Sequence, residues 1–457
     1  MNYPNTIVIT LKGKKDRKKY VKTHLYRRNL KFNFYEASLN SNPKRGCLES
    51  HLDIIKQSIE KDYDSIMILE DDIKFINFKK QLQQPPDDWD MLYLGGTVHR
   101  IIEKSPPWTK MTCWTTHAYI INLKNKELIE DILKMEDYSE EIDRFYLEKI
   151  HPKYNCYMID PMIAIQKSGY SSIEEKEVNY DFMIKTLEGL RKPEFKIEDD
   201  NYILKLDPIE EKDLPRVSII TPTYNRLSLF TLAINNYKNF DYPRDKLEWI
   251  IIDDTLYESQ EQSLETILPI DKSIKYLKIA DENIERPLTI AHKRNIGVQK
   301  STGSIIHHMD DDDYYPPHSI LSRVKVLKQY ESQGIHCVGC SLIGNYNIMN
   351  DTSSISCDSP ISLSEASMAY TRQFWNQRPF NIKDIRGEHK FFMEGRLENV
   401  MDLPHSFVIT AINHNSNFTQ NMRQSKNSNE LNYFDTWDEE TQMFMLELKQ
   451  FLKNKYK

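Results

Sequence analysis

Residues 304–317 read SIIHHMDDDDYYPP, an apolar segment that runs into four consecutive aspartates. A short apolar run that ends in polar residues predicts a buried β-strand over 304–310. Four adjacent carboxylates repel one another unless a cation compensates their charge. Side chains alternate along an extended segment, so Asp310 and Asp312 share a face and predict a site for a hard divalent cation. A solvated acidic loop is the alternative.

The alternation of strands and helices extends outward from this segment through both halves of the chain. In the second half we expect strands at 217–221 and 249–253 and helices at about 227–238, 289–300 and 317–331. The first half predicts strands at 7–10, 65–69, 91–96 and 118–123, with helices at 48–62 and 125–136. This pattern indicates an α/β fold, with two Rossmann-like domains whose central sheets are mostly parallel.

Glu70-Asp71-Asp72 repeats the acidic arrangement in the first half, directly after the strand expected at 65–69. Glu70 and Asp72 again share a face. In open α/β sheets the carboxyl ends of the strands are where ligands bind. The position therefore predicts a second site for a metal or a nucleotide.

The composition changes suggest where the domains end. We expect a first domain over 1–190, a polar, proline-containing linker over 191–213, a second domain over 214–425 and a helical tail over 426–457. The tail predicts a helix from about Thr436 to Lys453, with an apolar stripe made by Phe444, Leu448 and Phe451. We expect this stripe to pack on its own domain, with a partner or a membrane surface as the alternative.

Charge and hydropathy exclude several classes of protein. The formal net charge is −7, which argues against a nucleic-acid partner. We find no apolar run of about 18 residues and no signal-like start, so we expect no integral membrane segment and a cytoplasmic location. Cys337 and Cys340 form a C-x-x-C without a second pair, inside an apolar segment, and are interpreted as structural.

The chemistry that remains is metal-dependent. Neither a P-loop nor a G-x-G-x-x-G motif is present. A divalent ion held by carboxylates at a sheet edge commonly serves a diphosphate, whose departing charge it stabilises. This leaves nucleotide-sugar transfer, or metal-dependent phosphoryl or phosphodiester chemistry.

The second half resembles glycosyltransferase family 2, which has the GT-A fold. The resemblance rests on VSIITPTYNR at 217–226, WIIIDD at 249–254, AHKRNIGVQKSTGSIIHHMDDDDYYPP at 291–317 and GEHKFF at 387–392. It implies that the nucleotide sugar contacts Pro222, Tyr224, Arg226, Asp253, Asp254, Arg294, Asn295, Asp310 and Asp311. It also implies a metal held by Asp310 and Asp312, with a further ligand in His414. Glu388 is the implied catalytic base, and His389 stands where the family has a second acid.

The first half resembles glycosyltransferase family 25, which includes lipooligosaccharide and collagen galactosyltransferases. The matching segments are IVITLKGKKDR at 7–17, GCLESH at 46–51, IMILEDDIKF at 66–75, WDMLYLGG at 89–96, THAYIIN at 116–122 and EEIDRFY at 140–146. The resemblance implies nucleotide-sugar contacts from Arg17, Ser50, His51 and Glu70, and a metal held by Glu70 and Asp72. Asp143 is the implied acceptor-side or base residue.

Together the two resemblances imply a bifunctional, metal-dependent, inverting glycosyltransferase with one Mn²⁺ or Mg²⁺ in each active domain. The expected donor is a UDP-sugar, and the acceptor a glycan, a glycoprotein or a collagen-like chain. In one alternative only the second domain is catalytic and the first binds glycan or is structural; in another the chain is a metal-dependent phosphotransferase. The domain combination resembles glycan-modifying proteins of large DNA viruses, for which host cytoplasm or the virion would be the location.

Overall fold

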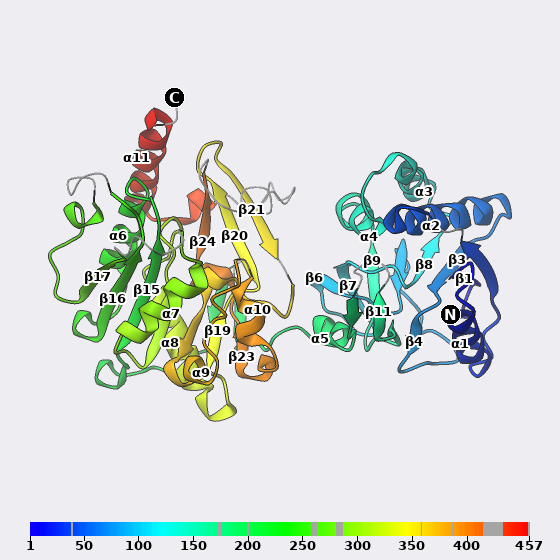
Figure 1. Cartoon of the computed structure of the whole chain (residues 1–457), viewed down its shortest axis with the longest axis horizontal. Coiled ribbons are helices and arrows are strands. Elements are labelled where there is room, and N and C mark those ends of the chain that lie inside the picture. The colour runs from blue at the N-terminus through cyan, green and yellow to red at the C-terminus, as the bar shows by residue number, and fades with distance from the viewer. Residues whose placement is uncertain are drawn as a thin grey trace. The chain divides into compact units, whose positions relative to one another are not determined.

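The structure is a computed structural model that describes residues 1–37, 40–171, 176–198, 201–257, 263–279, 287–357, 359–385, 387–414 and 433–455. The chain divides into two compact units, Met1–Gly189 and Leu190–Lys457 (Figure 1). Each unit is an α/β domain built around its own central sheet. The expected fold class is confirmed for both halves.

The first unit is built on an eight-stranded sheet with the order β2-β1-β3-β8-β5-β9-β7-β6. Only β7 and β8 run against the other strands, so the sheet is mostly parallel. Helix α1 packs on one face, whereas α2, α3 and α4 pack on the other. The strands are β1 (Asn5–Leu11), β2 (Asn33–Ala37), β3 (Ser65–Glu70), β5 (Met91–Tyr93), β6 (Val98–Glu103), β7 (Trp108–Cys113), β8 (Ala118–Asn122) and β9 (Cys156–Ile159). The helices are α1 (Lys15–Tyr26), α2 (Pro43–Glu60), α3 (Lys126–Leu133), α4 (Ile142–Phe145) and α5 (Phe182–Glu188).

The second unit is built on a seven-stranded sheet with the order β17-β16-β15-β18-β22-β19-β23. Here β22 alone runs against the other strands. Its strands are β15 (Val217–Thr223), β16 (Leu247–Asp253), β17 (Ile274–Lys278), β18 (Ile305–His308), β19 (Cys337–Gly339), β22 (Ala369–Thr371) and β23 (Val400–Asp402). The helices are α6 (Phe230–Asn239), α7 (Ile290–Lys300), α8 (Ser319–Gln329), α9 (Arg372–Gln377), α10 (Glu388–Met393) and α11 (Glu439–Lys455).

Both units also contain smaller sheets. In the first, β4 (Ile73–Phe75) pairs with β10 (Ala164–Gln166), and β11 (Gly169–Ser171) pairs with β12 (Lys176–Val178). In the second, β13 (Phe195–Glu198) pairs with β14 (Asn201–Leu204). A three-stranded sheet is formed by β21 (Thr352–Cys357), β20 (Leu342–Asn347) and β24 (Thr410–Asn413).

The two main sheets share one topology over six strands. In the first unit the strands lie in the order β2-β1-β3-β8-β5-β9, and in the second in the order β16-β15-β18-β22-β19-β23. In both, the strands lie across the sheet as the second, first, third, fifth, fourth and sixth of the six along the chain, and only the fifth is antiparallel. The acids after β3 and the acids after β18 therefore occupy the same place in two copies of one architecture.

Both faces of the second sheet are covered, which explains why its central strands are rich in apolar residues and fully buried. Ile219 packs with α6 and α8, whereas its neighbour Ile220 points to the opposite face and packs with α7, α9 and α10. Gly297 brings α7 close to the sheet, because a Cβ there would lie 2.5 Å from Ile220 Cγ2 and 2.8 Å from Ile252 Cδ1. This close packing fixes the position of the polar residues on α7.

The expected linker packs against the second unit. The carbonyl of Arg191 accepts a 2.7 Å hydrogen bond from the amide of Asp402, and the amide of Glu194 donates to the Tyr330 hydroxyl over 3.1 Å. Contacts therefore divide the chain at Gly189–Leu190, and the segment expected as a linker, 191–213, belongs to the second unit. The expected boundary at 425–426 lies outside the described residues.

The last helix packs on its own domain, as expected, and its buried face includes Leu448 of the predicted stripe, with Phe444 packed beside it, but not Phe451. Met445, Leu448 and Leu452 are buried against side chains that include Leu232 and Tyr346, whereas Phe451 is 48% exposed. The helix begins later than predicted, after Asp438, whose carboxylate accepts from the Thr441 amide over 2.7 Å. Among the described helices, none is both long and apolar enough to cross a membrane.

Candidate functional site

The acids of the second domain emerge at the carboxyl end of β18, as expected. Residues after β18 leave the extended conformation and enter a turn, so the strict alternation of a strand does not apply. The four aspartates nevertheless still alternate between partly exposed and buried side chains. The side chains of Asp310 and Asp312 are 23% and 15% exposed, whereas Asp311 and Asp313 are buried.

The two buried aspartates anchor this turn to the domain. Asp311 accepts a 2.5 Å hydrogen bond from the Thr223 hydroxyl at the end of β15, and Asp313 accepts from the Ile412 amide over 3.1 Å. Burial, and then the charge of Asp312, raises the pKa of Asp311 to about 7. A cation beside this turn would offset that repulsion.

Asp312 lies between the side chains of Arg226 and His414. Its carboxylate is 3.7 Å from the Arg226 guanidinium, which follows β15, and 3.3 Å from Nε2 of His414, which follows β24. The predicted metal ligands Asp312 and His414 therefore meet, although they are distant in sequence. Carboxylate oxygens and an imidazole nitrogen suit a divalent ion.

Arg294 on α7 connects two predicted functional acids. One guanidinium nitrogen pairs with Glu388, and the other lies 3.0 Å from Oδ1 of Asp310. The Arg294 side chain is 1% exposed, so these ion pairs are largely shielded from water. Burial lowers the pKa of Arg294, but the two carboxylates outweigh it and the pKa lies above its usual value.

The residues after β15 and β16 form a second polar group. Asp254 is fully buried, pairs with Lys293 of α7 and accepts a 2.6 Å hydrogen bond from the Leu288 amide. The Lys293 ammonium also donates to the Thr223 carbonyl over 2.8 Å, and it lies 5.5 Å from the Tyr224 ring. Tyr224 is 39% exposed, so its ring offers a flat surface beside this charge pair.

Three other residues predicted to contact the nucleotide sugar have side chains that pack or hydrogen-bond within the domain. Asp253 accepts hydrogen bonds from the Tyr257 and Tyr276 hydroxyls at 2.7 and 2.8 Å. Pro222 is buried in β15 opposite Ile252. The carboxamide of Asn295 accepts from Trp375 Nε1 over 2.9 Å and donates to the Phe380 carbonyl over 2.8 Å. These residues therefore support the walls of the site.

Glu388 begins α10, directly after Gly387, which has a φ of +68°. Burial raises the pKa of Glu388, although Arg294 partly offsets this effect. The next residue, His389, bonds through Nδ1 to Glu365, and its Nε2 lies 3.1 Å from the Ser362 hydroxyl. Glu365 had no role in the sequence interpretation, and His389 appeared there only as the residue that stands where the family has a second acid.

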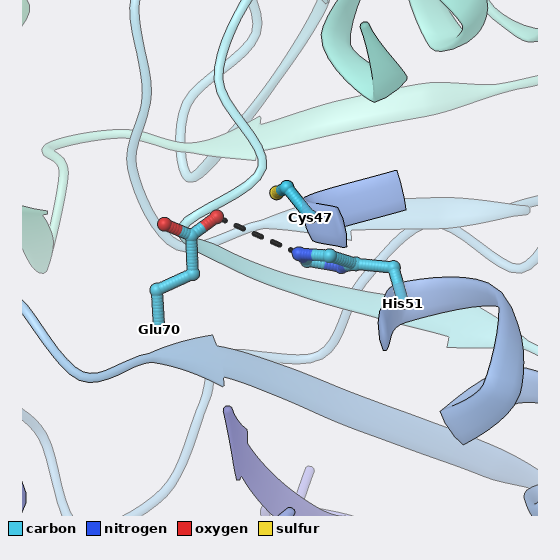
Figure 2. A group of neighbouring side chains, drawn as sticks. All are labelled: Cys47, His51 and Glu70. Carbon is cyan, nitrogen blue, oxygen red and sulfur yellow. Dashed lines mark ion pairs between the residues drawn. The ribbon is translucent and has the colours of Figure 1, made fainter. Parts of the chain in front are cut away.

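The first domain gathers a different set of side chains after β3. Figure 2 shows Cys47 and His51 of α2 directed toward Glu70 at the end of β3. His51 is fully buried, and its Nε2 lies 3.6 Å from Oε1 of Glu70. The Thr116 hydroxyl donates over 2.8 Å to Oδ1 of Asp143 and lies 3.4 Å from Glu70.

The acids that follow Glu70 contact Arg17, which lies on α1 after the first strand. The guanidinium is 3.3 Å from Asp71 and 3.5 Å from Asp72. Burial, and then the charge of Glu70, raises the pKa of Asp72 to about 7. The predicted contacts Arg17, Glu70 and Asp72 thus lie at one sheet edge.

Asp143 on α4 belongs to the same group through Thr116. Burial, and then the charge of Glu70, raises the pKa of Asp143 to about 8. Ser50 instead bonds to its own helix, since its hydroxyl donates to the Gly46 carbonyl over 2.7 Å. Sequence reasoning missed Cys47 and Thr116; the four-residue spacing of Cys47 and His51 on a helix was a signal for the former.

Comparisons with known proteins match a different family to each of the two units. Residues 38–183 match the model of glycosyltransferase family 25 (LPS biosynthesis protein), and residues 218–394 match that of glycosyl transferase family 2. The chain carries two glycosyltransferase domains. The match to family 25 includes Cys47, His51, Glu70 and Asp143, and the match to family 2 includes the acids from Asp310 to Asp313.

Two curated relatives are similar to part of this chain. The GalNAc(5)-diNAcBac-PP-undecaprenol beta-1,3-glucosyltransferase of Campylobacter jejuni is 29% identical over 161 residues, covering 34% of this chain and 48% of the relative. The poly(ribitol-phosphate) beta-N-acetylglucosaminyltransferase TarS of Staphylococcus aureus is 24% identical over 119 residues, covering 26% and 20%. The chain thus spans about half the length of the first relative and a fifth of the second.

Among solved structures, a mannosyltransferase of Pyrobaculum calidifontis in complex with GDP-Man and Mn²⁺ overlays with a TM-score of 0.35 and 16% identity. The overlay covers 46% of this chain and 59% of that one.

Proposed function

We propose that the chain is a bifunctional, metal-dependent glycosyltransferase that moves hexoses from nucleoside-diphosphate donors to hydroxyl acceptors, once in each domain. The observation that carries the proposal is the repeated placement of three groups on one topology. In each domain an arginine after the first strand reaches acids that follow the third strand of the shared topology. A further acid, the half-buried Asp143 or the buried Glu388, enters from the connection between the last two strands.

In the second domain Asp312 and His414, which lie 3.3 Å apart, would hold Mn²⁺ or Mg²⁺, and Asp310 would join them by leaving its ion pair with Arg294. Such an ion stabilises the charge that develops on a departing diphosphate. Arg226 and Lys293 supply fixed positive charge beside the acids, and Tyr224 supplies an exposed ring against which a base can stack. Asp253 and Asn295 hold the surrounding loops in place.

Glu388 is the proposed base of the second domain, and Asp143 that of the first. A base works best when its pKa lies near the operating pH. Burial raises the pKa of both carboxyl groups, that of Asp143 to about 8. Direct displacement by a hydroxyl deprotonated in this way would invert the anomeric centre. The names of both relatives describe hexosyl transfer, which supports this class of reaction.

The test uses the full chain with a panel of UDP- and GDP-sugars, with and without Mn²⁺. Asp312→Ala should lower transfer by the second domain roughly a hundredfold or more, since a catalytic metal supplies several kcal/mol. Donor binding by the first domain should remain, and Asp72→Ala should give the reverse pattern. Asp245→Ala removes an exposed aspartate of the second domain and is the matched control.

The outcomes separate the alternatives. If Asp312→Ala removes donor binding by both domains together, the two-site proposal fails. If Asp72→Ala changes nothing, only the second domain is catalytic. If no nucleotide sugar is bound or turned over under any condition, glycosyl transfer itself is refuted and a metal-dependent phosphotransferase takes its place.

A further inference from the structure

The first domain contains a ligand set that the second domain lacks. Cys47, His51 and Glu70 each direct one metal-binding atom into a common space, and these atoms all lie within 4.8 Å of one another (Figure 2). Among the described residues this is the one such convergence of at least three histidine, cysteine or acidic side chains. We propose that Cys47, His51 and Glu70 form a binding site for a thiophilic divalent metal, of which Zn²⁺ is the expected occupant.

One helix and one strand bring these atoms together. Cys47 and His51 lie four residues apart on α2, so their side chains lie on the same face one turn apart. Glu70 is the last residue of β3 and approaches that face from the sheet. The site is thus built on two rigid elements of the domain core.

The distance between His51 and Glu70 fits an ion better than a hydrogen bond. Nε2 and Oε1 are 3.6 Å apart, which is too long for a hydrogen bond. Nitrogen and oxygen ligands at zinc distances in a tetrahedron are separated by about 3.4 Å. Nε2 of His51 is fully buried and has no hydrogen-bond partner. Its ion-pair partner is the Glu70 carboxylate, so a metal between the two would give this buried nitrogen the direct bond that it lacks.

The other nitrogen of His51, Nδ1, contacts a tyrosine that can orient the ring for metal binding through Nε2. Nδ1 lies 2.7 Å from the Tyr119 hydroxyl, which in turn lies 3.3 Å from the Tyr146 hydroxyl. If Nδ1 carries the proton and donates to Tyr119, the lone pair of Nε2 faces Cys47 and Glu70. Histidine ligands are commonly oriented by such an outer partner. The His51 ring also stacks on the Tyr119 ring, with centroids 5.7 Å apart.

The chemical nature of the ligands selects the metal. A thiolate and an imidazole favour Zn²⁺, whereas Mg²⁺ and Mn²⁺ favour carboxylate and water oxygens. Binding forms a sulfur–metal bond, and the Cys47 thiol proton leaves to solvent. Three protein ligands leave a fourth position open, as in catalytic zinc sites. This inference goes beyond the proposed function, because it concerns which metal the chain binds and not which group it transfers.

The first test measures metal protection of thiols in the wild-type full chain. Cys47 and Cys357 are half-buried, and the other four cysteines are buried, so Cys357 serves as an internal control. Zn²⁺ at ten times its dissociation constant should slow alkylation of Cys47 about tenfold, since about a tenth of the sites remain free. Alkylation of Cys357 should not change, and Mg²⁺ should protect neither thiol. Equal alkylation of Cys47 with and without Zn²⁺ would overturn the proposal.

The second test identifies the ligands. Co²⁺ added to the metal-free full chain should give the visible absorption of a tetrahedral site and a thiolate-to-cobalt charge-transfer band. Cys47→Ser should remove the charge-transfer band, and His51→Asn should weaken binding, while Cys357→Ser should leave the spectrum unchanged. Persistence of the band in Cys47→Ser would refute this assignment. Neither test depends on sugar transfer, so failure of the metal site is distinguishable from failure of the proposed activity.

Discussion

Replacing Arg294 by methionine should destabilise the second domain far more than removal of an exposed charge. Arg294 is 1% exposed and neutralises Glu388 and Asp310, whose side chains are 6% and 23% exposed. Methionine keeps most of the volume but leaves both carboxylates without their shared cation. Loss of one partner from a buried ion pair costs about 3–5 kcal/mol. Arg294→Lys, which keeps the charge, should be intermediate because it cannot pair with both acids at once.

Hydrogen exchange measured by mass spectrometry on peptides from β15 and β16 isolates this effect within the full chain. A cost of about 3–5 kcal/mol corresponds to roughly a hundredfold to several thousandfold faster exchange of amides that open only on unfolding of the domain. Lys328→Met is the matched control, since Lys328 and Glu331 are 43% and 52% exposed and such pairs contribute below about 1 kcal/mol. If Arg294→Met exchanges no faster than this control, the buried network described here is wrong.

Three further predictions test the packing and electrostatics of the second domain. Glu248 is fully buried; burial opposes its ionisation, but Lys275, Ser218 and Thr302 outweigh this and lower its pKa from 4.5 to about 2. Because the folded-state pKa is lowered, ionised Glu248 stabilises the fold above about pH 4.5, and this stabilisation is lost as the pH falls toward 2. In urea unfolding, Glu248→Gln should therefore lower the free energy of unfolding by about 3 kcal/mol at pH 7 and by progressively less below pH 4.5. An equal deficit at pH 7 and pH 3 would contradict this assignment. Leu452→Ala should lower the free energy of unfolding by about 2–5 kcal/mol, whereas Phe451→Ala should change it by about 0.5 kcal/mol or less, as measured by thermal unfolding. The reverse order would mean that Phe451 lies on the buried face, as the sequence predicted. Gly297→Ala should cost about 1–3 kcal/mol in the same assay, because its Cβ would overlap Ile220 and Ile252, and a neutral result would mean that α7 can move away from the sheet at no cost.

The prediction of the fold succeeded where the signal was local. Apolar runs of strand length marked β1, β3, β15, β16 and β18 correctly, because strands covered by helices are rich in apolar residues. The same reasoning placed Glu70 and Asp310 at carboxyl ends of strands. The buried face of the last helix was predicted only in part: Leu448 is buried and Phe444 packs beside it, but Phe451 is exposed and Leu452 takes its place, because packing against Leu232 and Tyr346 selects among the stripes that the pattern offers.

The sequence by itself determined that the chain has two α/β halves, each with acids at a strand end, because hydrophobic period and strand-end position are local properties. Only the tertiary structure decided which groups meet. Arg294 reaches Glu388 across 94 residues of chain, and His414 reaches Asp312 across 102. Neither separation leaves a local pattern, since the contacts depend on how α7, α10 and β24 pack around the sheet. The approach of Cys47 and His51 to Glu70 has the same origin: a helix and a strand are each encoded locally, but their relative placement is fixed by the core that both of them bury.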